Sequence, residues 1–256
     1  MDLAYQTQGI GTPVVLVHSP GVDSREWRYI APHLARSHQV ITYDGRGTGK
    51  SPAPQKPTSL VEDLRALLDH LEIDSASLVG HSMGGQAVTD FALTYPSRVD
   101  HLVLIAPSLT GFEHSQPFID WMAQVNACAP DVNRLVEQSL SGPNYRVTMS
   151  SAEGDFLREM HTLYMTRVFS EWKSFEVVWP MPPAIERLEE LVARTLFIQG
   201  TVEWEDMQRI AEQFKRVQDI RFEVIEGADH MVTLTHAEEL AGLILTFLEG
   251  TLSSKG

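Results

Sequence analysis

The sequence has almost no cysteine and no excess of basic residues. Cys128 is the only cysteine among 256 residues, which excludes an internal disulfide and a Cys-x-x-Cys metal site. A single cysteine suits a reducing compartment, and we predict a cytoplasmic protein. Lysine and arginine total 20 against 34 acidic residues, which gives a formal charge of −14. Nucleic acids and anionic membrane surfaces bind clustered basic residues, and the chain has no such cluster.

Long apolar runs are missing as well. No stretch approaches the roughly 18 apolar residues that a membrane span needs. The first five residues, Met-Asp-Leu-Ala-Tyr, have neither the basic nor the apolar region of a signal peptide. The ten histidines show no His-Glu-x-x-His or comparable ligand spacing. We therefore expect no membrane anchor, no metal and no cofactor.

What the chain does contain is a regular alternation of short apolar runs and amphipathic segments. Buried strands of parallel sheets are apolar on both faces, and helices connect them. This alternation predicts an α/β fold with a mostly parallel sheet and helices on both of its faces. The predicted strands are 3–8, 14–17, the run ending at Gly80, 102–105, 195–199 and 221–225, with a further strand at 40–43. The predicted helices are 25–36, a helix capped by Ser59 over 60–71, and 84–95, 206–217 and 237–248.

The alternation stops after residue 110 and resumes near residue 191. Between these points only helical patterns occur, with many methionines and aromatic residues. We predict a core domain formed by 1–110 and 191–256, with a helical cap inserted at 111–190. A chain of this length suits one domain that carries an insertion. We expect the tail at 251–256 to be frayed.

The strongest chemical signal is Gly80-His81-Ser82-Met83-Gly84, which fits the pattern Gly-x-Ser-x-Gly. An apolar run precedes it and a helical pattern follows. A serine on a sharp strand-to-helix turn has a strained backbone, and the turn closes only if the residues two positions away lack a bulky Cβ. Its hydroxyl would then lie beside the positive end of a helix, where the Met83 N–H points at a developing oxyanion.

Four loops that follow predicted strands carry chemically suggestive residues: 18–23, Ser82, Glu203 and His230. The loops after parallel strands emerge at one edge of the sheet, where open α/β proteins bind their ligands. The order serine, acid, histidine is also the order found in hydrolases with such a turn.

Four stretches of the chain, in this order, resemble the α/β-hydrolase family, and the resemblance covers nearly the whole chain. They read Val-His-Ser-Pro-Gly-Val-Asp-Ser-Arg-Glu-Trp, Tyr-Asp-Gly-Arg-Gly-Thr-Gly-Lys-Ser-Pro, Gly-His-Ser-Met-Gly-Gly and Gly-Ala-Asp-His. The resemblance implies the α/β-hydrolase fold with a helical cap and no cofactor. The first stretch is also similar to the corresponding loop of enol-lactonases and related hydrolases of small esters.

The resemblance further implies a catalytic triad. Ser82 would be the nucleophile and His230 its general base, since imidazole accepts a proton near neutrality. The family places its acid three residues after the strand that ends at Gly200, which is Glu203 here, with Glu205 and Asp206 as rivals. We interpret Asp229 as a residue that braces the loop, because neighbours on an extended loop point apart.

The loop that would hold the oxyanion departs from the family pattern. The family often has His-Gly-x, where x donates an N–H, and here Pro20 stands at x. Proline has no N–H, and one missing donor typically costs ~10²–10³ in rate. Gly21 or Ser19 would then donate instead, or Met83 would act alone. As weaker candidates for the substrate pocket we name His81 and Trp121.

These features predict a serine hydrolase that cleaves a small, largely apolar carboxylic ester or lactone through an acyl-enzyme. A carbon–carbon bond hydrolase acting on diketones is an alternative. If its substrates carry carboxylates, Arg146, Arg158 or Arg167 would face Ser82. A perhydrolase is compatible too, and Pro20 keeps open a ligand-binding or sensor protein with little turnover. A monomer and a homodimer both remain open.

Overall fold

A seven-stranded sheet with the order β1-β3-β2-β4-β5-β6-β7 forms the centre of the molecule. Among the strands of the described residues, only β1 runs antiparallel to its neighbour, and every other neighbouring pair is parallel. The computed structural model describes residues 1–250, so the predicted tail at 251–256 lies outside the described part. The predicted α/β fold class is confirmed. The strands are β1 (Tyr5–Gln8), β2 (Thr12–Val17), β3 (His38–Tyr43), β4 (Ala76–His81), β5 (Val99–Ile105), β6 (Arg194–Val202) and β7 (Ile220–Asp229).

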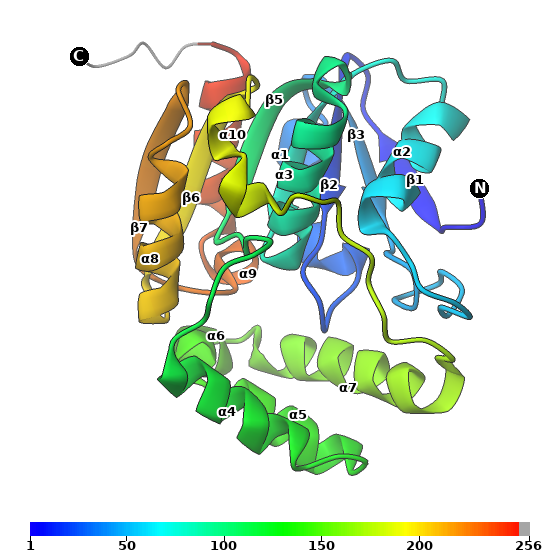
Figure 1. Cartoon of the computed structure of the whole chain (residues 1–256), viewed down its shortest axis with the longest axis vertical. Coiled ribbons are helices and arrows are strands. Elements are labelled where there is room, and N and C mark those ends of the chain that lie inside the picture. Colours follow the sequence, from blue (N-terminus) through cyan, green and yellow to red (C-terminus); the bar gives the residue numbers. More distant parts are fainter. Residues whose placement is uncertain (251–256) are drawn as a thin grey trace.

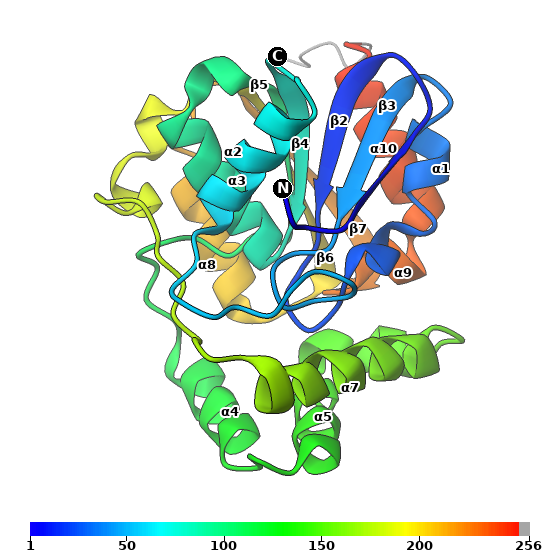
Figure 2. The same ribbon diagram turned by 90° about the vertical axis from the view of Figure 1, so that its right-hand side faces the viewer.

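Helices cover both faces of this sheet, as Figure 2 shows. One face carries α2 (Leu60–His70), α3 (Met83–Thr94) and α8 (Glu205–Phe214). The other carries α1 (Ala31–Leu34), α9 (Val232–Thr235) and α10 (Ala237–Leu248). Side chains of β2 alternate between the two apolar layers: Val15 and Val17 pack on the α3 side, and Val14 and Leu16 on the α10 side. This explains why the run is apolar without a break.

The helix predicted at 25–36 does not exist as one element. The structure has a 3₁₀ turn, η1 (Ser24–Trp27), followed by the single-turn helix α1. Pro32 stands in the first turn of α1. A proline inside a longer helix would lack its N–H and clash with the preceding turn, so the segment breaks before it. The predicted helix was wrong here, although Trp27, Ile30 and Leu34 are all buried as its spacing indicated.

The segment after β5 forms a layer of helices that lies across the carboxyl edge of the sheet (Figure 1). We call α4 (Gln116–Asn126), α5 (Val132–Leu140), α6 (Arg146–Met149) and α7 (Gly154–Glu171) the cap. Short 3₁₀ turns accompany it at Pro143–Tyr145 (η3), Ala184–Glu186 (η4) and Leu188–Glu190 (η5), besides η2 (Pro96–Arg98) in the core. Ala184 and Leu188 pack in the main core, so the chain returns to the core before residue 190. Within residues 1–250, every helix is too short or too polar to cross a membrane.

Candidate active site

Ser82 lies on a strained turn between β4 and α3. Its backbone angles are φ 55° and ψ −119°, a region that residues with a side chain rarely occupy. The flanking glycines are required by space. A Cβ on Gly80 would lie 2.5 Å from the Gly84 carbonyl oxygen, and a Cβ on Gly84 would lie 2.2 Å from that of Val17. The turn therefore closes only with glycine at both positions.

Met83 is the first residue of α3. The opening N–H groups of a helix have no acceptor inside the helix, and they carry its positive partial charge. The Ser82 N–H instead donates to the carbonyl of Ile105 at 2.9 Å, which fixes the turn on the neighbouring strand β5. The Met83 N–H is one of these opening donors, and Met83 follows Ser82 directly in the chain.

His230 follows β7 and contacts Glu203, which lies between β6 and α8. Its Nδ1 is 3.0 Å from Oε1 and 3.2 Å from Oε2 of Glu203. The two side chains are only 14% and 6% exposed, so water screens the contact little. Burial lowers the pKa of His230, but the nearby carboxylates together outweigh it, above all through the charge and hydrogen bond of Glu203, so this pKa lies above its usual value.

The other acids near this loop have different partners. Glu205 is exposed and begins α8. Asp206 accepts hydrogen bonds from the N–H and hydroxyl of Ser115 and pairs with Arg209, so it fixes the start of α4. Asp229 accepts the Thr148 N–H at 2.7 Å and thereby ties β7 to the cap. Among these four carboxylates, the structure brings only Glu203 to the imidazole.

The oxyanion loop offers fewer donors than the sequence allowed. Pro20 and Gly21 line the cavity above Ser82. The Ser19 N–H donates to Oε2 of the buried Glu26 at 2.9 Å, so Ser19 is not an oxyanion donor here, and that part of the prediction is wrong. Gly21 has φ +81°, which a residue with a Cβ rarely adopts. Gly21 therefore stays a predicted donor of this loop.

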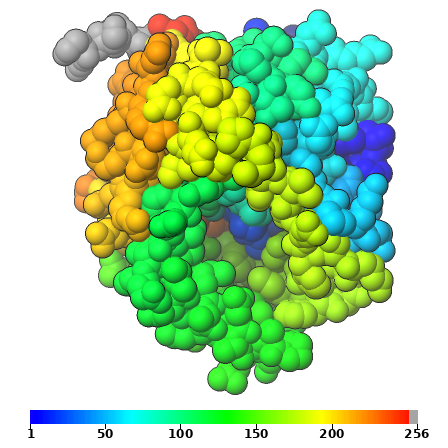
Figure 3. All heavy atoms as spheres, in the orientation of Figure 1, coloured from blue at the N-terminus to red at the C-terminus, as the bar shows by residue number. Residues whose placement is uncertain are grey.

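A cavity of about 610 Å³ opens between the cap and the carboxyl edge of the sheet, with Ser82, Glu203 and His230 in its walls. Figure 3 shows the surface hollowed between α4 and the segment after α7. Within the described residues no lysine or arginine lines it, whereas Glu203 and Asp206 do. Its walls are mainly apolar, for example at Phe118, Trp121, Met122, Met165, Val168 and Met207. Such a cavity suits an uncharged, apolar ligand.

The two weaker pocket candidates have different positions. Trp121 lines the cavity from α4. His81 does not: its side chain is fully buried beneath the site, where its Nδ1 bonds Oε1 of Glu26, so its assignment to the pocket is wrong. The residue before the serine ends β4 and points into the protein interior.

Within residues 1–250, the His230 imidazole hydrogen-bonds only Glu203. Contacts to the nucleophile are often long in ligand-free enzymes.

Sequence reasoning missed three residues of this region. Glu26 is the buried carboxylate that accepts the Ser19 N–H and bonds His81. His161 of α7 lines the cavity against Gly21, because a Cβ on that glycine would lie 2.9 Å from the ring. Burial lowers the pKa of His161 to about 4, so the ring is neutral near pH 7. Tyr145 packs edge-on against His230, with ring centroids 6.1 Å apart. No local motif marks cap residues, since only the packing of the cap brings them here.

Residues 1–250 contain no group of three or more His, Cys, Asp and Glu side chains arranged to hold a metal ion. Glu203 and Glu26 bond the imidazoles of His230 and His81, and Asp229 accepts the Thr148 N–H.

Comparisons with known proteins agree with this architecture. A family model described as "alpha/beta hydrolase fold" matches residues 12–143. A putative non-heme chloroperoxidase of Synechocystis sp. is 26% identical over 97% of this chain and 95% of its own length. A 2-hydroxy-6-oxo-2,4-heptadienoate hydrolase of Pseudomonas putida is 41% identical, over 41% of each protein. The chain spans between 35% and 59% of the length of the first curated relatives that it matches.

A solved structure extends the comparison to the whole fold. The enol-lactonase of Burkholderia xenovorans LB400 superposes with a TM-score of 0.77 and covers 96% of both chains. Only 19% of residues are identical, so this likeness concerns the fold alone.

Proposed function

Since the chain belongs to the α/β-hydrolase family, we propose that it is a serine hydrolase of small, largely apolar carboxylic esters or lactones. One observation carries the proposal: a strained serine and a carboxylate-bound histidine, far apart in sequence, share the wall of one apolar cavity. This arrangement supports nucleophilic catalysis, in which a third group orients the base.

In the first half-reaction the Ser82 hydroxyl attacks the carbonyl carbon of the ester. Its proton passes to Nε2 of His230, because Nδ1 is held by Glu203. Glu203 stabilises the imidazolium that forms. When the tetrahedral intermediate collapses, the bond to the alcohol oxygen breaks, and His230 returns the proton to that oxygen. An acyl-enzyme on Ser82 remains.

In the second half-reaction a water molecule attacks the acyl carbon. His230 takes a proton from this water and then gives it to the Ser82 oxygen as the acid leaves. The negative oxygen of both intermediates would be held by the N–H groups of Met83 and Gly21. Met83 is the first residue of α3, and Gly21 would donate in place of Pro20, which has no N–H.

The cavity also bears on the choice between substrates. A diketone substrate with a carboxylate would need a cation near Ser82, but Arg146 is exposed and the other two candidates pair elsewhere. Arg158 pairs with Glu137, and Arg167 bonds the carbonyls of Gly49 and Ser51. Carboxylates in the wall repel a charged acid, so we favour neutral esters and lactones over the carbon–carbon bond and perhydrolase alternatives.

The test is a panel of short-chain nitrophenyl esters and unsubstituted lactones, measured with the wild type and with Ser82→Ala. We expect turnover by the wild type and a loss of at least ~10⁴-fold in Ser82→Ala. A carboxylated diketone cleaved faster than every ester would favour the carbon–carbon bond hydrolase. Tight ligand binding with negligible turnover, unchanged by Ser82→Ala, would favour the sensor protein.

A further inference from the structure

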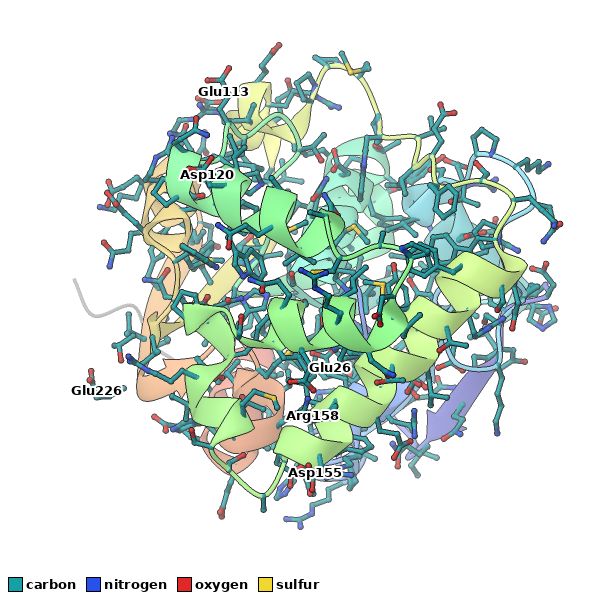
Figure 4. The ribbon with its side chains drawn as sticks, turned by 90° about the horizontal axis from the view of Figure 1, so that it is seen from below. Glu26, Glu113, Asp120, Asp155, Arg158 and Glu226 are labelled. Carbon is teal, nitrogen blue, oxygen red and sulfur yellow. The ribbon has the colours of Figure 1, made fainter. Side chains whose placement is uncertain are left out.

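A fully buried carboxylate joins the three loops that form the candidate active site. Glu26 of η1 has no exposed surface, and in Figure 4 it lies near the centre, beneath the cap, whereas the other labelled residues lie farther out. No lysine or arginine bonds it among residues 1–250. A buried charge is retained only when it is well hydrogen-bonded, so its partners indicate its role.

Its partners come from three separate segments. Oε2 accepts the Ser19 N–H of the oxyanion loop at 2.9 Å. Oε1 accepts from Nδ1 of His81, the residue that precedes Ser82, and from the Thr233 hydroxyl at 3.1 Å. Thr233 lies in α9, three residues after His230. One carboxylate thus fixes the oxyanion loop, the nucleophile turn and the histidine loop relative to one another.

The same carboxylate acts on the charge of His230. Burial raises the pKa of Glu26, but His81, the Ser19 N–H and the more distant His18 outweigh it, and the pKa ends below the usual value. Glu26 is therefore ionised near neutrality. The His81 ring lies between the two groups, with its centroid 4.9 Å from that of His230. Glu203, Asp229 and Glu26 all favour the protonated form of His230, and the neutral Tyr145 faces it from the cap.

We propose that Glu26 is a positioning residue of this site: it sets the relative placement of Ser82, His230 and the oxyanion loop, and it supports the positive charge that His230 gains in each half-reaction. The inference rests on the proposed function. Glu26 does not line the cavity, so it acts through His81, Ser19 and Thr233 and not by touching the substrate.

The test is Glu26→Gln, which keeps the size of the side chain and removes its charge. We expect kcat to fall by about 10- to 100-fold, because small displacements of catalytic groups have effects of that size, while KM changes by less than about threefold. When kcat/KM is plotted against pH, its rise on the acid side (the acid limb) should move to lower pH. The matched control is Thr233→Val, which removes one hydrogen bond and keeps the carboxylate, so the limb should stay in place.

Two further measurements keep the inference open to refutation. If Glu26→Gln does not fold, Glu26→Gln with His81→Gln leaves no buried charge unpaired, and the same shift of the acid limb is expected. If the wild type proves inactive, the proposed function fails separately, and the pKa of His230 is then read by NMR. A His230 pKa that is equal in wild type and Glu26→Gln, or a loss of stability without a change in kcat, would overturn the role of Glu26.

Discussion

Replacing Glu203 by glutamine separates the role of this carboxylate from its bulk. Both Glu203 oxygens lie within 3.2 Å of Nδ1 of His230, so ionised Glu203 holds the ring proton on Nδ1 and leaves Nε2 free to accept from Ser82. A glutamine amide can instead donate to Nδ1, which places the ring proton on Nε2. In that tautomer the imidazole is no base for the serine.

The expected loss is about 10⁴-fold in kcat, the size seen when the carboxylate of a serine protease triad is made an amide. It corresponds to about 5.4 kcal/mol in activation free energy. The matched control is Glu205→Gln, two residues along, because Glu205 begins α8 and, among the described residues, the imidazole hydrogen-bonds Glu203. We expect kcat of the control to stay within about threefold of wild type.

The pH dependence gives a second, independent readout. The base must be neutral, so activity rises as pH increases through the pKa of His230, and the structure raises that pKa above 6.5. Glu203→Gln should therefore move the acid limb to lower pH. A raised folded-state pKa contributes stability that is complete below about 6.5 and is lost as pH rises through the folded value. The stability difference between wild type and Glu203→Gln should thus be larger at pH 5.5 than at pH 8.5.

The assay combines pH-resolved steady-state kinetics on a nitrophenyl ester with urea unfolding at the two pH values. Equal kcat in Glu203→Gln and Glu205→Gln would refute the assignment of the acid. An acid limb that stays in place would contradict the electrostatic argument even if kcat falls.

Three further predictions follow from single contacts. Gly84→Ala would place a Cβ 2.2 Å from the Val17 carbonyl oxygen. We expect the unfolding free energy to fall by several kcal/mol, as at strained or overpacked sites, and an unchanged stability would contradict the geometry of the turn at Ser82. Pro20→Ala restores a backbone N–H at position 20. If Gly21 already donates to the oxyanion, kcat of the variant stays within about threefold of wild type. A rise in kcat above tenfold would show that the wild type lacks this donor. Asp206→Asn should lower the melting temperature and leave the acid limb of the pH–activity profile unchanged, since Asp206 holds Ser115 and not His230. A shift of this limb would restore Asp206 as a rival for the triad acid.

The strand pattern and the strand-to-helix turn at Ser82 were predictable because both depend on local chemistry. An unbroken apolar run such as 14–17 suits only a strand that is buried on both faces, and the glycines around Ser82 are needed by a turn of five residues. The prediction of Glu203 came from the resemblance to the α/β-hydrolase family, which places its acid three residues after this strand. The helix at 25–36 failed because apolar spacing outweighed Pro32 in the prediction.

The buried polar contacts were not predictable, because they join segments that are distant in sequence. His81 was assigned to the pocket from its place beside Ser82, but the direction of its side chain depends on Glu26, which is 55 positions away. Ser19 was a reasonable donor until the structure showed that its N–H is already taken by the same carboxylate. Cap residues such as His161 reach the cavity only through the packing of α7, which carries no motif.

Active-site labelling tests the central claim most directly. Wild-type protein and Ser82→Ala are treated with a fluorophosphonate at pH 8, and the adduct is located by peptide mass spectrometry. The account predicts one covalent adduct, on the peptide that contains Ser82, with none in Ser82→Ala and much slower labelling in His230→Ala. Wild-type protein that stays unlabelled, or an adduct on another residue that persists in Ser82→Ala, would contradict it.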